Sequence, residues 1–297
     1  MSLTPHHDKL VAAITNPKCS DDKKLLEEVL ERYKDWVKSI KSLTSTRQEC
    51  VNQMVELLNE YKDFLEVSAI AKRGSAFLKR QKGQLKLDNS VLEEFLIYLV
   101  DDRIIEGLPN DFRIDFGPHT AFMSLSFRPE GIASLNERPS VVLKRKDQDF
   151  TIGKKIHYQF SSSSTFENNK TTTGELYLSV FAAEIKINYD KTMFQECAGT
   201  ASRLKQGCPI AKYYALVEYL DMLPEDCRLT EIDNVFLLRK VKRLPVNKRP
   251  ILAEVEKQHK NYPIAKEVMW NFVQEMQSFV NAIWYDPKEA LKRGSFV

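Results

Sequence analysis

The sequence predicts an α/β protein in which a mixed central sheet is flanked by helices and preceded by a helical N-terminal part. Before residue 100, apolar residues recur at helical spacing. Beyond residue 113 the apolar period changes towards two, as in strands. The segment 176–186, LYLSVFAAEIK, is apolar almost throughout and is typical of a buried central strand. We expect a helical region over 1–85 and an α/β domain that ends in a C-terminal helix over 86–297.

The N-terminal region is expected to begin with a loose polar arm over residues 1–19, which contain two prolines and His6. Helical periodicity then predicts one helix over 21–41 and a second over about 46–65. A capping-box pattern, Thr46 with Glu49, opens the second helix.

The remaining elements follow from changes of period and from turn residues. A capping-box pattern, Ser90 with Glu93, opens a helix over 90–99 and gives Glu93 a local structural role. A polar, low-complexity hairpin loop is expected over 161–173. We expect strands over 113–116, 121–127, 141–149, 150–160, 176–186, 213–220 and 234–238, helices over 191–205 and 264–283, and a basic loop over 244–263.

Composition excludes several classes of protein. The 297 residues are 43% hydrophobic, which is enough for a substantial core, and the formal net charge is only +3. The five cysteines form no Cys-x-x-Cys pair, so neither a zinc site nor a disulfide framework is indicated. No apolar run reaches the length of a membrane span and no signal peptide is visible, so we expect a cytoplasmic protein. There is no Gly-rich phosphate loop and no Gly-x-Ser-x-Gly or His-Glu-x-x-His motif.

Two basic clusters could meet phosphates: Lys72-Arg73 and Lys79-Arg80-Gln81-Lys82. A solvated basic loop would have the same composition. The sequence alone leaves both interpretations open.

The strongest chemical signal is the charged end of the strand over 176–186. Glu184 and Lys186 point to the same face because side chains alternate along a strand. Asp149 precedes Glu184 by 184 − 149 = 35 residues. This Asp…Glu-x-Lys pattern occurs in the PD-(D/E)xK nucleases, where it supports a divalent metal and an activated water. An ordinary strand end with a surface ion pair would produce the same triplet.

Longer segments make the resemblance more specific. The chain resembles the heterodimeric Type II restriction endonucleases represented by BbvCI, whose subunits are homologous PD-(D/E)xK nucleases. It is most similar to the subunit type that carries the ECAGTA segment. The matching segments, in chain order, are LEEF, KDQDFTIG, EIK, ECAGTASRLK, VEYL, LTEID and WYDP…ALKRG.

This resemblance implies a PD-(D/E)xK restriction-endonuclease-like fold and Mg²⁺-dependent hydrolysis of double-stranded DNA at an asymmetric site resembling CCTNAGC. Asp149, Glu184 and Lys186 stand at the family's motif positions, and Glu94 stands at its helix glutamate. Gln148 replaces the motif proline, which ligates nothing.

Mg²⁺ would be bound by Asp149, Glu184 and the carbonyl of Ile185, since it prefers hard oxygen ligands. Lys186 could act as a base or hold the phosphate. Each subunit would cut one strand, and the partner would be a homologous second subunit, although the chain could form a homodimer when alone.

Two alternatives remain open at the level of sequence. The chain could be a non-catalytic DNA-binding or assembly subunit whose partner does the cutting. It could also be a DNA-repair nuclease of the same fold, with the same chemistry and a different substrate.

Overall fold

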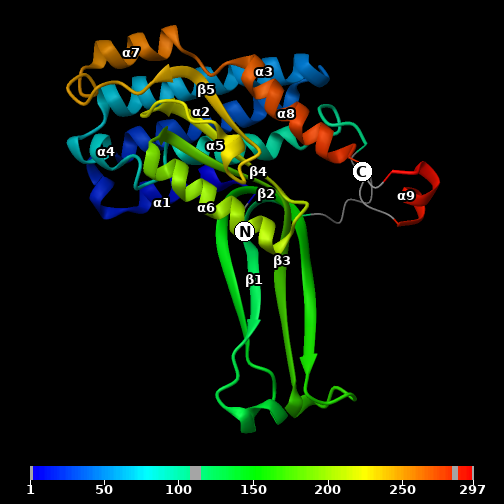
Figure 1. Cartoon of the computed structure of the whole chain (residues 1–297). Coiled ribbons are helices and arrows are strands. Elements are labelled where there is room, and N and C mark those ends of the chain that lie inside the picture. The colour runs from blue at the N-terminus through cyan, green and yellow to red at the C-terminus, as the bar shows by residue number, and fades with distance from the viewer. Residues whose placement is uncertain (1–2, 108–114, 283–286, 296–297) are drawn as a thin grey trace.

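The computed structural model of the chain describes residues 3–107, 115–282 and 287–295 (Figure 1). The helices are α1 Pro5–Thr15, α2 Lys23–Ser42, α3 Arg47–Lys62, α4 Ala76–Gln81, α5 Asn89–Leu99, α6 Lys191–Gly207, α7 Leu252–Asn261, α8 Lys266–Val280 and α9 Pro287–Arg293. The strands are β1 Asp115–Phe127, β2 Val141–Ser161, β3 Thr171–Tyr189, β4 Lys212–Leu220 and β5 Asn234–Lys242. After α3 the chain continues as a π-helix over Asp63–Ala71. None of the helices in the described ranges is long and apolar enough to cross a membrane.

The five described strands form one mixed sheet in the order β1-β2-β3-β4-β5. Strands β1, β2 and β3 pair antiparallel, whereas β3, β4 and β5 pair parallel. A parallel pair needs a long crossover, and α6 provides the one between β3 and β4. The predicted α/β class with a mixed sheet and flanking helices is therefore confirmed.

Helices cover both faces of the sheet. The larger buried cluster joins α1, α2, α3, α5 and α8 to one face, through side chains such as Phe181 and Phe272. The smaller cluster joins α6 to the other face, through Ala182, Phe194 and Leu204. The larger cluster includes residues on both sides of position 85, so the division into 1–85 and 86–297 stays a prediction.

Strands β1, β2 and β3 extend as a long arm away from the helical body (Figure 1). Both ends of β2 lie at the tip of this arm, where the Phe127 and Phe160 rings are 5.1 Å apart and Thr172 Oγ1 donates to the Pro139 carbonyl at 2.6 Å. Strand β2 therefore bends at the body end. The pairing register shifts at Gly153, where a Cβ would lie 2.1 Å from the Leu178 carbonyl oxygen. Only glycine allows this close backbone approach.

Several expectations about the N-terminal region were wrong. Residues 5–15 form α1 rather than a loose arm, and His6 is fully buried. Its ring contacts Ser90 Oγ and Tyr61 Oη at 2.8 and 2.7 Å, and burial lowers its pKa to about 3. The sequence could not show this, because the partners of His6 lie 55 and 84 residues away.

Other boundaries also changed. Helix α5 begins at Asn89 with Asp88 as N-cap, so the Ser90 capping box does not form. The expected basic loop over 244–263 contains α7. The expected strands over 121–127 and 115–116 are one strand, and those over 141–149 and 150–160 are another; positions 113, 114 and 283 lie outside the described residues.

Candidate active site

Strands β2 and β3 bring Asp149 and Glu184 together where their pairing ends. Phe150 pairs with Ala183, so the next residues outward along the two antiparallel strands are Asp149 and Glu184. The Ile185 backbone N–H donates to Asp149 Oδ2 at 2.8 Å. This contact ties the Asp149 carboxylate to the Glu-x-Lys segment, 36 residues further along the chain.

Lys186 lies against Glu184 as strand alternation predicts. Its Nζ donates to Glu184 Oε1 at 2.8 Å, and the Glu184 side chain is only 8% exposed. Burial alone would lower the pKa of Lys186, but the Glu184 carboxylate outweighs burial and raises that pKa above its usual value. Lys186 is therefore an ammonium group at neutral pH.

Asp149 lies in a negatively charged environment. Burial, followed by the Glu184 and Glu93 carboxylates, raises its pKa from 3.8 to about 7. The Ile185 N–H and the Lys86 ammonium, 3.9 Å from Asp149 Oδ1, oppose this rise. A carboxyl held partly protonated by its neighbours is ready to accept a cation.

Helix α5 supplies Glu93 to this group, not Glu94 as expected. Glu93 Oε1 accepts from Asn89 Nδ2 at 2.7 Å and lies 3.5 Å from Lys86 Nζ, the same ammonium that approaches Asp149. Glu94 turns the other way, where the Tyr33 and Tyr98 hydroxyls donate to its Oε1 at 2.6 and 2.7 Å. Neighbouring helix residues point in different directions, and tertiary packing decided which one faces the strands.

Helix α6, which contains the ECAGTA segment, covers the same group of charged side chains. Lys146 Nζ donates to Glu196 Oε1 at 3.0 Å and to Thr200 Oγ1 at 2.7 Å. The positive charge of Lys186 also lowers the pKa of Glu196, after the hydrogen bond from Lys146. Sequence reasoning used this segment only for its resemblance and missed Lys86, Glu93, Lys146 and Glu196 as neighbours of the site. The charged residues just before Asp149 and just after β3 were the available signal for Lys146 and Glu196, whereas Lys86 and Glu93 lie more than 50 residues before Asp149 in the sequence.

The group has the chemistry of a divalent-cation site. Three carboxylates (Glu93, Asp149 and Glu184) face two ammonium groups (Lys86 and Lys186), and Glu184 Oε2 is buried without a hydrogen-bond partner among the described residues. Within the same ranges no three His, Cys, Asp or Glu side chains gather as a metal cluster. The ligand set expected from the sequence, the carboxylates of Asp149 and Glu184 with the carbonyl of Ile185, consists of oxygen atoms alone. Such all-oxygen sets, completed by water, suit Mg²⁺.

A mixed sheet flanked by helices, with an acid pair and a lysine where the pairing of β2 and β3 ends, is typical of a restriction-endonuclease-like fold. The structure is similar to a chain of the native BbvCI A2B2 tetramer, with a TM-score of 0.67 and 19% identity over 96% of this chain and 99% of that chain. A family profile described as Bpu10I restriction endonuclease matches residues 84–296. The chain belongs to this restriction endonuclease family and is a nuclease. No curated protein sequence matches it.

Proposed function

We propose that this chain is a subunit of a Type II restriction endonuclease and hydrolyses one strand of double-stranded DNA, while a homologous second subunit hydrolyses the other. The site would be short and asymmetric, resembling CCTNAGC. Family membership supports the nuclease activity. The observation that carries the catalytic role is the Asp149–Glu184–Lys186 group, in which a buried Glu184 oxygen has no protein partner within the described chain.

The proposed cofactor is Mg²⁺, held by the carboxylates of Asp149 and Glu184 and by the carbonyl of Ile185. When bound, Mg²⁺ supplies positive charge that neutralises a phosphate and makes water more acidic. Lys86, which lies 3.5 Å from Glu93 and 3.9 Å from Asp149, would help to position the Asp149 carboxylate. Glu94 has no part in this site, because its carboxylate is occupied by the tyrosines of the helical core.

Lys186 is assigned to hold the scissile phosphate or to orient the attacking water. The raised pKa of Lys186 keeps its side chain protonated, and a protonated amine cannot accept a proton. This argument favours the phosphate-binding role over the general-base role that the sequence left open.

The proposed partner is a homologous second subunit. Two-fold symmetry in a homodimer calls for a palindromic site, so an asymmetric site requires two different reading surfaces. The similar BbvCI chain is described as part of an A2B2 tetramer, which supports such an assembly here. A homodimer of the isolated chain would use the surface meant for the partner.

The test is cleavage of supercoiled plasmid by this chain combined with its homologous second subunit in Mg²⁺. The unaltered complex should yield linear DNA, and EDTA should abolish cleavage. The Lys186→Ala chain with the unaltered partner should yield open-circular DNA that is never linearised. Glu175→Gln, an exposed change on the same strand β3, is the matched control and should still give linear product.

Linear product from the Lys186→Ala complex would mean that this chain does not own a catalytic centre. Open-circular product from the Glu175→Gln control would mean that nicking results from a general disturbance of strand β3 and not from the loss of Lys186. Cleavage at full rate in EDTA would exclude the metal site.

A further inference from the structure

Two basic segments that are far apart in the sequence line one groove. This groove has a volume of about 400 Å³ and lies between α4 and the chain that connects β5 to α7. Its basic lining residues are Lys79, Arg80, Lys82, Arg243 and Arg249. The first three belong to one of the two clusters singled out by the sequence, and the other two follow β5 more than 160 residues later. We call this surface the basic groove.

Two segments of the chain connect the basic groove to the candidate active site. Ile187 and Asn188 line it, and they directly follow Lys186 on β3. In the other segment, Lys82 is four residues before Lys86, whose ammonium contacts Asp149. A polymer bound at Lys186 could therefore continue into the groove.

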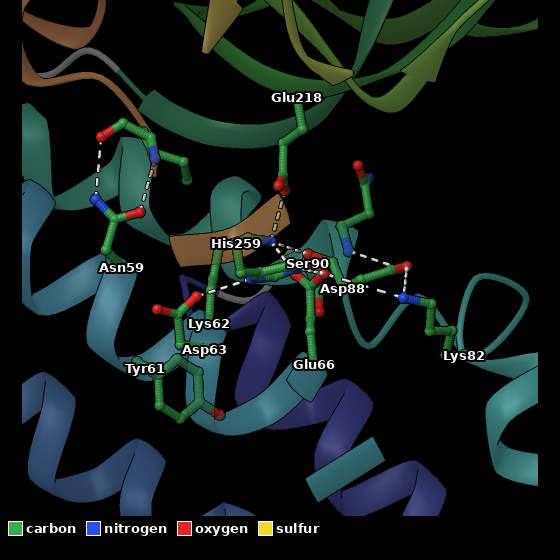
Figure 2. Close-up of polar contacts among 12 residues, drawn as sticks. Asn59, Tyr61, Lys62, Asp63, Glu66, Lys82, Asp88, Ser90, Glu218 and His259 are labelled. Atoms are coloured by element: carbon green, nitrogen blue, oxygen red, sulfur yellow. Dashed lines mark hydrogen bonds and ion pairs between the residues drawn. The ribbon is translucent and has the colours of Figure 1, made fainter. Parts of the chain in front are cut away.

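The acidic residues beneath the groove are already neutralised by the protein. Glu66 is buried and its Oε1 lies 2.6 Å from Lys62 Nζ (Figure 2). Lys82 spans Glu66 and Asp88 at 3.9 and 3.7 Å, and its side chain is still 36% exposed. The buried carboxylates thus lie behind Lys82 and do not cancel the charge of the groove rim.

The rim itself keeps an excess of positive charge. Arg243 and Arg249 share a single carboxylate, that of Asp221, at 3.2 and 3.5 Å. No ion pair to Lys79 or Arg80 occurs within the described chain, and both are exposed. By contrast, the other basic cluster is partly used, since Arg73 makes a two-pronged contact with Glu28.

We infer that the basic groove binds the phosphodiester backbone of the DNA strand next to the scissile phosphate. The inference rests on the proposed function for its ligand. Several cations along a groove suit a chain of singly charged phosphates at regular spacing. Contacts of this kind position the duplex and carry no base sequence. Lys79 and Arg80 contact the backbone from one wall, and Arg249 contacts it from the other.

The experiment measures binding of the full chain to two 30-base-pair duplexes of unrelated sequence, by fluorescence anisotropy in Ca²⁺ over a series of salt concentrations. The variants are Lys79→Gln with Arg80→Gln on one wall, and Arg249→Gln on the other. The matched control neutralises Lys38 and Lys41, two exposed lysines in the last turns of α2. Thermal unfolding of each variant shows whether it is folded.

We expect the groove variants to weaken binding of both duplexes by the same factor. The slope of log affinity against log salt should fall by about 1 for each lost phosphate contact. The Lys38/Lys41 control should match the unaltered chain. If the folded groove variants bind both duplexes as the control does, the inferred DNA contact of the basic groove is wrong. The proposed nuclease function would be unaffected by that result. Failure of the unaltered chain, with or without its second subunit, to bind either duplex would overturn the proposed function itself.

Discussion

Two groups of buried charges in this molecule have opposite balances. The first, the buried ion network, contains four buried residues: Lys62, Glu66, Glu218 and Arg239. Figure 2 draws Lys62, Glu66 and Glu218 of this network. Lys62 Nζ lies 2.6 Å from Glu66 and 2.5 Å from Glu218, and Arg239 Nε lies 2.8 Å from Glu218. Two cations match two anions, so the network is neutral as a whole.

The candidate active site has three carboxylates and two ammonium groups. The imbalance appears in the pKa values. Burial and neighbouring carboxylates raise the pKa of Asp149 to about 7. In the buried ion network, burial acts against charge as well, but Lys62 holds the pKa of Glu66 well below its usual range. The charges of the balanced group are compensated within the protein, whereas the unbalanced group keeps a net negative charge that would attract a cation. The comparison distinguishes carboxylates that the protein compensates from carboxylates that it does not.

The largest expected effect is on the buried ion network. Glu218→Gln leaves Lys62 and Arg239 buried with one carboxylate between them, which should destabilise the protein by about 3–5 kcal/mol. Urea unfolding of the isolated chain measures this change. The exposed Glu175→Gln should change stability by less than about 0.5 kcal/mol. A loss below about 1 kcal/mol for Glu218→Gln would show that the network does not depend on its charge balance.

An intermediate effect is expected for Glu94, whose carboxylate is bound within the helical core, in contrast to its neighbour Glu93, which belongs to the candidate active site. Glu94→Gln weakens hydrogen bonds from Tyr33, Tyr98 and the His6 backbone, at an expected cost of about 1–3 kcal/mol. Glu93→Gln should cost less, and it should weaken Ca²⁺ binding measured by calorimetry because it removes negative charge beside Asp149. A stronger effect of Glu94→Gln than of Glu93→Gln on Ca²⁺ affinity would reverse our assignment of the two residues.

The smallest expected effect is a gain in stability. Asp149→Asn removes a carboxylate whose pKa in the folded chain is raised from 3.8 to about 7. Such a group stabilises the fold below its ordinary pKa, and this contribution is lost as pH rises to about 7. A pKa rise of this size corresponds to about 4 kcal/mol, and the weaker hydrogen bond from the Ile185 N–H to asparagine offsets part of it. Without divalent metal, the variant should therefore be more stable than the unaltered chain at pH 8, by a net amount on the order of 1–2 kcal/mol.

The melting-temperature difference between Asp149→Asn and the unaltered chain should shrink towards pH 4, and Mg²⁺ should reduce it at pH 8 by stabilising only the unaltered chain. Lys154→Gln, a change of an exposed side chain on the same strand, serves as the control. Equal stability of the Asp149→Asn variant and the unaltered chain at both pH values would mean that the charged Asp149 carboxylate does not destabilise the fold.

Much of the fold could be predicted because its signals are local. The apolar period distinguishes α2 and α3 from the strands, and the near-continuous apolar run before Glu184 identifies β3 as a central strand. Strand alternation also predicted that Glu184 and Lys186 share a face, and their side chains are 2.8 Å apart. The catalytic and metal-binding roles of these residues remain predictions.

Other features depended on contacts between distant segments. The N-terminal segment contains a short apolar run, LVAAI over residues 10–14, but nothing in its sequence indicates that His6 is held by Tyr61 and Ser90. The bend in β2 depends on the approach of Gly153 to the Leu178 carbonyl of another strand. Neither contact leaves a trace in the local sequence.

The sequence by itself determined the order and type of most elements and the positions of Asp149, Glu184 and Lys186, because periodicity and strand alternation are properties of neighbouring residues. The tertiary structure alone decided that Glu93 rather than Glu94 faces Asp149, that Lys62 and Arg239 meet Glu218, and that two distant basic segments share one groove. These outcomes depend on how the helices pack on the sheet. Packing sets which side chains lose water and which charges lie near enough to compensate one another.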